Sequence, residues 1–119
     1  MKVGMVKKPK FNNRKVELDG LAFDSKKEAR RYNDLKLLCR AGEISDLKTQ
    51  VYFELAPKVK LWGETRTKSA IRYVADFTYI KDGQLIIEDV KSAITKDQAV
   101  FRMKKHLMKT VLGLDVQEY

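Results

Sequence analysis

Alternating apolar and polar positions predict a chain of short strands separated by turns. The predicted strands span residues 16–18, 21–23, 44–56, 73–80, 85–91 and 114–119. Residues 58–62 alternate too and are expected to form a further strand or to continue the strand over 44–56. Apolar positions at helical spacing predict two helices, over residues 25–41 and about 97–112. A glycine follows each predicted helix and is expected to end it.

The order of these elements predicts a single α/β domain over residues 16–119. Short connections between the central strands imply antiparallel neighbours, whereas a strand reached through a helix can pair in parallel. We therefore expect a central mixed β-sheet, an antiparallel meander plus one parallel strand, flanked by helices. Residues 1–15 carry basic charges and no acid, and we expect them to form a flexible basic arm.

The second predicted hairpin carries acids inside otherwise apolar strands. Asp76 lies in the middle of its first strand, and its second strand ends in Glu88-Asp89-Val90-Lys91. Charged residues are depleted in strand interiors, so acids at these positions need a reason. Strand alternation places Asp89 and Lys91 on one face and Glu88 on the other. Two carboxylates and one ammonium are thus expected to converge at the end of this hairpin.

This group of residues suits a hard divalent cation, because Mg²⁺ prefers oxygen ligands and takes one or two carboxylates together with water. We expect Asp76 and Asp89 to be its ligands, with the backbone carbonyl of Val90 as a third oxygen. Lys91 is expected to position the attacking water or to stabilise charge on a phosphate. The alternative is structural: the two aspartates form ion pairs with Lys91 and Arg72.

Glu28 falls within the apolar stripe of the first predicted helix, beside Ala29, Tyr32 and Leu35. One interpretation is a capping box with Ser25, three residues earlier. The other is that Glu28 faces inward because it joins the acidic site. It would then be a catalytic residue and a further metal ligand, or it would hold a second metal ion.

The second predicted helix has a basic residue within its apolar stripe. Thr95 or Asp97 is expected to cap this helix. Its apolar stripe consists of Val100, Phe101, Leu107, Met108 and Val111. Lys104 lies among these residues. Either its stem is buried and its ammonium reaches solvent, or the ammonium is delivered to the acidic site.

Composition narrows the classes of function. The chain has 119 residues and a single cysteine, which excludes an intrachain disulfide and a cysteine-based zinc site. It has no apolar run near the ~20 residues that a membrane helix needs. The basic N-terminus lacks the apolar segment of a secretory signal, so we expect a cytoplasmic protein without a membrane partner.

The net charge of +9 predicts a polyanionic partner, above all nucleic acid. Two basic segments are expected to contact its phosphates, the N-terminal arm and the polar loop over residues 63–69. The expected DNA-binding residues are Lys7, Lys8, Lys10, Arg14, Lys15, Arg66 and Lys68. The sequence has no evident helix-turn-helix or zinc module, which argues against sequence-specific binding.

Asp76 followed by Asp89-Val90-Lys91, with the helix-borne Glu28 upstream, resembles the core of the PD-(D/E)xK nuclease superfamily, which has the restriction-endonuclease-like fold. A longer string of residues between Val16 and Leu112 is similar to a family of small phage- and prophage-encoded endonucleases. That string consists of Asp19-Gly20, Phe23-Asp24-Ser25-Lys26, Glu28-Ala29, Tyr32, Gly42-Glu43-Ile44, Leu47, Gln50-Val51, Tyr73-Val74-Ala75-Asp76-Phe77 and Glu88-Asp89-Val90-Lys91. Ala75 stands where many members carry proline, a departure that removes no ligand.

The resemblance implies a hydrolase, a Mg²⁺- or Mn²⁺-dependent endodeoxyribonuclease that uses water to cleave DNA phosphodiester bonds. It also implies that Gln50 and Lys104 support the site, and that the protein acts as a homodimer in the cytoplasm of a phage host. We expect structure-selective cleavage of branched DNA or Holliday junctions in recombination, replication or DNA maturation. Two alternatives stay open: a non-catalytic nucleic-acid-binding module, and a nuclease that acts on single-stranded DNA or RNA.

Overall fold

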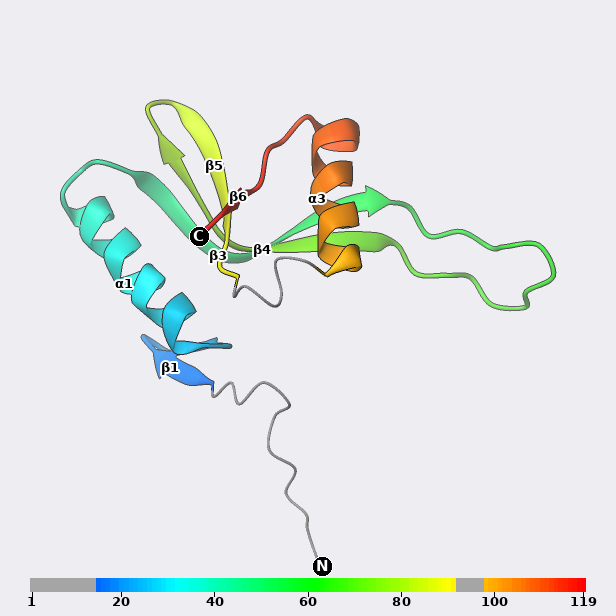
Figure 1. Ribbon diagram of the computed structural model, residues 1–119, viewed down its shortest axis with the longest axis horizontal. Coiled ribbons are helices and arrows are strands. Elements are labelled where there is room, and N and C mark those ends of the chain that lie inside the picture. The colour runs from blue at the N-terminus through cyan, green and yellow to red at the C-terminus, as the bar shows by residue number, and fades with distance from the viewer. Residues whose placement is uncertain (1–14, 92–97) are drawn as a thin grey trace, which may run out of the picture.

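The computed structural model describes residues 15–91 and 98–119, which form an α/β fold around a mixed sheet (Figure 1). Its elements are β1 (Val16–Leu18), β2 (Leu21–Phe23), α1 (Lys26–Arg40), β3 (Ser45–Ala56), β4 (Ile71–Lys81), β5 (Gln84–Asp89), α3 (Ala99–Leu112) and β6 (Gln117–Glu118). The sheet order is β3-β4-β5-β6, with β3, β4 and β5 antiparallel and β6 parallel to β5. The predicted α/β class with a mixed sheet is confirmed.

Two hydrophobic cores lie on opposite faces of β5. Ile86 packs against the core of α1, which includes Leu35. The next residue, Ile87, belongs to the core of α3, together with Phe101 and Met108. Because successive side chains of a strand point to opposite faces, α1 and α3 cover opposite faces of β5. Figure 1 shows the two helices on either side of the strands.

The first helix forms where the sequence predicts it. Ser25 is its N-cap, and the Ser25 hydroxyl accepts a hydrogen bond of 3.1 Å from the backbone N–H of Glu28. Gly42 follows the helix with a φ of +79°, a left-handed conformation that glycine adopts without strain. The β1–β2 hairpin that precedes α1 also forms as predicted, over Val16–Leu18 and Leu21–Phe23.

The second helix buries a narrower stripe than predicted. Its sheet-facing side buries Phe101 and Met108, and Leu107 is partly buried against the same core. Val100 and Val111 are 58% and 52% exposed, so their assignment to the buried stripe is wrong. Both side chains remain largely in solvent, although Leu107 on the same side of the helix is partly buried.

The start of the second helix also differs from the prediction. Its N-cap is Gln98, whose side chain makes no capping hydrogen bond. The predicted caps, Thr95 and Asp97, lie outside the described residues. Gly113 ends the helix with a φ of +73°, as predicted.

The prediction that residues 58–62 form a strand, or continue β3, is wrong. This segment belongs to a long connection between β3 and β4, residues 57–70, which we call the β3–β4 arm. Its one bridge among the described residues pairs Val59 with Lys68, so the arm is a ribbon with little ladder structure. Figure 1 shows it projecting away from the sheet and from both helices, where no further strand can pair with it.

Three expectations concern the chain as a whole. Residues 1–14, most of the predicted basic arm, lie outside the described residues. None of the described helices has the length and apolar character needed to cross a membrane. Cys39 is a free cysteine, partly buried beside the core of α1.

Candidate active site

Asp76 lies where β4 and β5 separate. The pairing of these strands ends at Phe77 and Glu88. Beyond that point the backbone N–H of Val90 donates a hydrogen bond of 2.7 Å to Oδ2 of Asp76. The carboxylate thus takes the place of a strand neighbour, and this holds Asp76 at the end of the ladder, next to Asp89.

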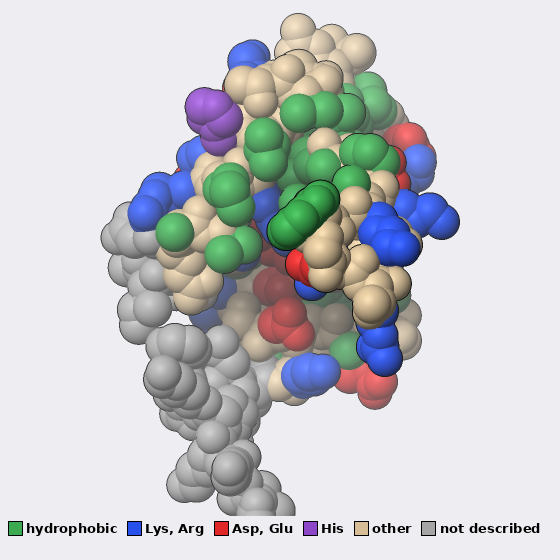
Figure 2. All heavy atoms as spheres, turned by 90° about the vertical axis from the view of Figure 1, so that its right-hand side faces the viewer, with side chains coloured by type: hydrophobic (Ala, Val, Ile, Leu, Met, Phe, Trp, Pro, Cys, Tyr) green, Lys and Arg blue, Asp and Glu red, His purple; other side chains and the backbone are tan. Residues whose placement is uncertain are grey.

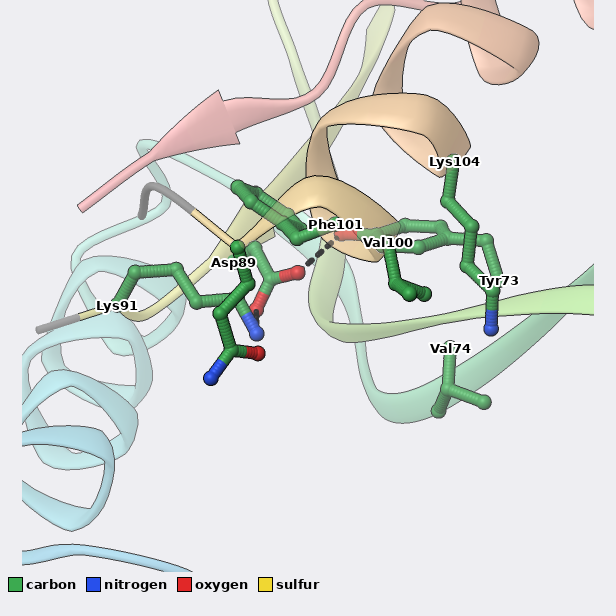
Figure 3. Close-up of a pocket in the computed structure, with 8 residues that line it drawn as sticks. Tyr73, Val74, Asp89, Lys91, Val100, Phe101 and Lys104 are labelled. Atoms are coloured by element: carbon green, nitrogen blue, oxygen red, sulfur yellow. Dashed lines mark hydrogen bonds and ion pairs between the residues drawn. The ribbon is translucent and has the colours of Figure 1, made fainter. Parts of the chain in front are cut away.

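Asp89 is almost completely buried, at 2% exposure. The Tyr73 hydroxyl donates a hydrogen bond of 2.6 Å to its Oδ2, which Figure 3 shows as a dashed line. The Lys91 ammonium lies 3.3 Å from its Oδ1. Each oxygen therefore has its own partner, and the carboxylate is fixed in orientation.

Lys91 is held between an acid and an aromatic ring. Its ammonium contacts Asp89 and lies 4.7 Å from the ring centroid of Phe101. Its backbone N–H donates to the carbonyl of Tyr119, whose own N–H donates to the carbonyl of Asp89. The Lys27 ammonium donates to the Lys91 carbonyl at 3.0 Å. The parallel pairing of β6 thus fixes the backbone that carries Asp89 and Lys91.

Glu88 points to the other face, as strand alternation predicts. Arg31 of α1 donates two hydrogen bonds to its carboxylate, at 2.8 and 2.6 Å. The Tyr79 hydroxyl donates to the same carboxylate. The Arg31 guanidinium also lies 4.0 Å from the ring centroid of Tyr119. Glu88 is therefore a structural acid that joins α1 to β5.

Glu28 combines parts of both interpretations given to it. Its backbone N–H donates to the Ser25 cap, so the peptide group of Glu28 takes part in capping. Its carboxylate is buried, at 4% exposure, and accepts a hydrogen bond of 3.2 Å from Nε2 of Gln50. The side chain thus points to β3 and the interior, away from solvent.

Gln50 has an unusual backbone conformation at this site. Its φ is +53°, a left-handed value that few residues other than glycine adopt. It stands opposite Asp76 in the register of β3 and β4, between the pairs Thr49–Phe77 and Val51–Ala75. Strained backbone of this kind clusters at functional sites. The local conformation aims the Gln50 amide at Glu28.

The carboxylates influence one another electrostatically. Burial and then the neighbouring Asp89 raise the pKa of Asp76 to about 8, and Glu28 adds to the shift while the Val90 N–H opposes it. Burial and then the charges of Asp24 and Asp89 raise the pKa of Glu28 to about 7, against the effect of Lys91. Asp76, Asp89 and Glu28 thus form a cluster of buried acids in which three simultaneous negative charges are unfavourable.

A hollow of about 260 Å³ opens beside Asp89. Its lining residues are Tyr73, Val74, Asp89, Lys91, Gln98, Val100, Phe101 and Lys104. Lys104 is partly buried in its wall, and Figure 3 shows it across the hollow from Lys91. Lys104 makes no ion pair with Asp76 or Asp89, so the structure places it near the site without joining it to the acids.

The oxygen donors present fit a magnesium ion held through few protein ligands. Asp76 and Asp89 adjoin each other, and Val90 stands between Asp89 and Lys91. Within residues 15–91 and 98–119, no three His, Cys, Asp or Glu side chains have the spacing that would hold a metal ion by themselves. One or two carboxylates with a carbonyl and water match the usual ligands of Mg²⁺, whereas the Glu28 carboxylate is already engaged by the Gln50 amide.

Sequence reasoning missed two residues that position the site. Tyr73 donates to Asp89, and the Phe101 ring lies beside the Lys91 ammonium. A buried tyrosine hydroxyl needs a hydrogen-bond partner, and this could have drawn attention to Tyr73 in an otherwise apolar strand. The role of Phe101 depends on how α3 packs on the sheet, which has no local signal.

The predicted DNA-binding residues lie away from the acids or outside the described residues. Lys7, Lys8, Lys10 and Arg14 are outside them. Lys15, Arg66 and Lys68 are exposed. Lys68 pairs with Glu64 on the β3–β4 arm, at 3.0 Å. The structure does not bring these side chains into the acidic site.

Comparison with known proteins gives a match over most of the chain. Residues 8–114 match a family described as "Protein of unknown function (DUF1064)". No curated protein and no solved structure matches the chain.

Proposed function

The chain belongs to the DUF1064 family of proteins of unknown function, and from the geometry of its site we propose that it is a metal-dependent DNA endonuclease. The observation that carries this proposal is the meeting of Asp76 and Asp89 at the point where β4 and β5 separate, with the Lys91 ammonium 3.3 Å from Asp89. Two acids and a lysine at the end of a hairpin resemble the constellation of a PD-(D/E)xK nuclease, and this resemblance supports the proposal. The mixed sheet with its parallel last strand is compatible with the restriction-endonuclease-like fold that we propose for the chain.

The proposed cofactor is Mg²⁺ or Mn²⁺, held by Asp76, Asp89 and the Val90 carbonyl, with Glu28 at the margin. When bound, such an ion lowers the pKa of water and offsets charge on the leaving oxygen. Tyr73 and the Val90 N–H hold the two aspartates in place. The Lys91 ammonium, fixed beside Phe101, is placed to stabilise the developing negative charge of the phosphate. Gln50 and Lys104 are proposed to support the site from β3 and α3.

The substrate that we propose is DNA with branches or junctions, cut in recombination, replication or DNA maturation of a phage within the host cytoplasm. The net charge of +9 supports a nucleic-acid substrate. We also propose a homodimer, because one chain has one such site and a junction needs two cuts. Sedimentation at micromolar concentration, with and without a four-way junction, measures the oligomeric state directly.

The decisive experiment incubates the purified protein with plasmid DNA and four-way junctions in Mg²⁺ or Mn²⁺. We expect nicking or cutting that EDTA abolishes and that Asp76→Asn, Asp89→Asn and Lys91→Ala each remove. Asp115→Asn is the matched control, because Asp115 is an exposed acid paired with Lys109 far along the chain. Cleavage that persisted in EDTA or in all three variants would contradict the proposal.

Two outcomes would favour other functions. Tight DNA binding without cleavage in any divalent metal indicates a non-catalytic binding module. Metal-dependent cleavage confined to single-stranded DNA or RNA indicates a nuclease of different substrate class. Testing all these substrates under one condition distinguishes the proposed endonuclease, the binding module and the nuclease of single-stranded DNA or RNA.

A further inference from the structure

The β3–β4 arm, residues 57–70, carries a fully exposed aromatic side chain at the turn between its two halves. Trp62 is 99% exposed, and it is the one tryptophan of the chain. Its neighbours Val59 and Leu61 are 49% and 48% exposed. Large aromatic side chains are normally buried, so an apolar group displayed in this way marks an interaction site.

The arm presents this indole on a structured ribbon. Val59 and Lys68 exchange two backbone hydrogen bonds, of 3.0 and 2.6 Å, in line with the hairpin of β3 and β4. Gly63 turns the chain next to Trp62 with a φ of +79°. Figure 1 shows the arm reaching well beyond the sheet. Trp62 is therefore held at a distance from the domain, where a large partner can meet it.

The charge of the arm selects the kind of partner. Four basic residues lie on it, Lys58, Lys60, Arg66 and Lys68, and its one acid is Glu64, which already pairs with Lys68. An arm of a second copy would bring the same positive charge, whereas a polyanion complements it. Exposed aromatic rings among cations are the elements with which proteins bind single-stranded nucleic acid, because any base can stack on the ring.

We propose that the β3–β4 arm binds nucleic acid, with Trp62 stacked on an unpaired base and the basic residues of the arm on the flanking phosphates. This inference rests on the proposed nuclease function and names the part of the substrate that the protein recognises. A base within a continuous duplex offers no free face to an indole, whereas a base at a junction or in a single strand does. The arm thus supplies a physical basis for structure selectivity.

The arm and the acidic site are open to one substrate. Figure 2 looks at the molecule from the side to which the arm projects, and shows acidic side chains in a recess with basic side chains around it. The hollow beside Asp89 is lined in part by α3, which packs on the strands that lead into the arm. A nucleic acid held by Trp62 can therefore extend towards Asp89 and Lys91.

The test uses the fluorescence of Trp62, which reports on the arm alone because no other tryptophan is present. The full chain is titrated in EDTA, so that nothing is cleaved, with a single-stranded oligonucleotide, a four-way junction and a blunt duplex. We expect strong quenching by the single strand and the junction and little by the duplex.

Variants at the tip separate stacking from general binding. We expect Trp62→Ala to weaken single-strand binding about 10-fold, and duplex binding less than about two-fold. Trp62→Phe should retain most of the affinity, because a phenyl ring still stacks. Leu37→Ala, at a 59% exposed apolar residue of α1 away from the arm, is the control and should bind as the unchanged protein does.

The outcomes that overturn the inference differ from those that overturn the nuclease proposal. If Mg²⁺-dependent cleavage occurs but Trp62 is not quenched and Trp62→Ala binds normally, the inference fails alone. If Trp62 stacks but no metal supports cleavage, the nuclease proposal fails and the arm belongs to a binding module. If Trp62 fluorescence shifts with protein concentration in the absence of DNA and Trp62→Ala breaks a dimer, the arm contacts a second copy and the inference fails.

Discussion

The Tyr73 hydroxyl donates a 2.6 Å hydrogen bond to Oδ2 of Asp89 and leaves Oδ1 of the same carboxylate to Lys91. Tyr73, near the start of β4, and Asp89, at the end of β5, are thereby joined across the open end of the hairpin. The tyrosine does not carry charge to the substrate. Tyr73 fixes the side-chain orientation of Asp89, on which the proposed reaction depends. Tyr73 is therefore a positioning residue.

Tyr73→Phe should therefore impair cleavage while leaving the fold in place. Loss of one hydrogen bond to a buried carboxylate costs about 1–3 kcal/mol of unfolding free energy. We expect kcat to fall about 10-fold or more with KM for DNA little changed, because Tyr73 is 3% exposed and its hydroxyl is engaged by Asp89. Steady-state cleavage and urea unfolding measure the two effects. Tyr52→Phe, at a 59% exposed tyrosine, is the control and should change neither.

The two roles of Glu28 separate into two substitutions. Ser25→Ala removes the oxygen that caps the helix and should lower the unfolding free energy by about 1 kcal/mol with little effect on cleavage. Glu28→Gln keeps the capping peptide N–H and removes one of three neighbouring negative charges. It should leave stability equal or higher and lower metal-dependent cleavage. A variant Glu28→Gln that is unstable but fully active would show that the side chain is structural.

Stability should fall with rising pH in the absence of divalent metal. The pKa values of Asp76 and Glu28 are raised to about 8 and about 7 in the folded state, from about 4 in the unfolded chain. The folded state therefore binds these protons more tightly, so their contribution is fully present below pH ~4 and is lost as pH rises through 7 and 8. Urea unfolding in EDTA between pH 5 and 8.5 measures the slope.

The control for this pH dependence is Asp76→Asn, which cannot titrate at the position. It should flatten the slope between pH 5 and 8.5 and raise stability at pH 8. An unchanged slope in this variant would contradict the raised pKa of Asp76.

The buried ion pair between Arg31 and Glu88 should matter for folding alone. Arg31→Ala leaves the Glu88 carboxylate buried without its cation, and such a loss costs about 3–5 kcal/mol. Glu88→Gln, which keeps an oxygen for Arg31 and Tyr79, should cost less. Cleavage per folded molecule should be unchanged in both. Thermal unfolding combined with active-site titration gives the two quantities separately.

Local sequence patterns predicted the elements that depend on local signals. The Ser25 cap, the glycines after the helices and the alternation around Glu88 and Asp89 each correspond to a contact or conformation in the structure. The parallel pairing of β6 followed from the helix crossover before it. The cap, the helix ends and the direction in which Glu88 points are set by near neighbours in the chain, so one sequence suffices to predict them.

The features that the sequence did not predict depend on long-range packing. Alternation in residues 58–62 suggested a strand, yet no partner strand extends along the arm. Val100 and Val111 belong to the apolar periodicity of their helix, but both stay more than half exposed. The left-handed Gln50 and the contact of Lys91 with Phe101 arise from how β3 and α3 meet the central strands. Contacts between elements that are distant in the chain leave no periodic pattern in the sequence.

The two separate hydrophobic cores give the acids a mechanical consequence. Glu28 stands beside the core of α1, while Tyr73 and Phe101 belong to the core of α3, and Asp76 and Asp89 occupy the seam between them. Where apolar contacts would have joined the two halves, the seam holds buried carboxyl groups that resist being ionised together. A divalent cation bound by Asp76 and Asp89 would then have a structural role as well as a chemical one. Its binding would bring the two halves of the domain together and complete the site in one step.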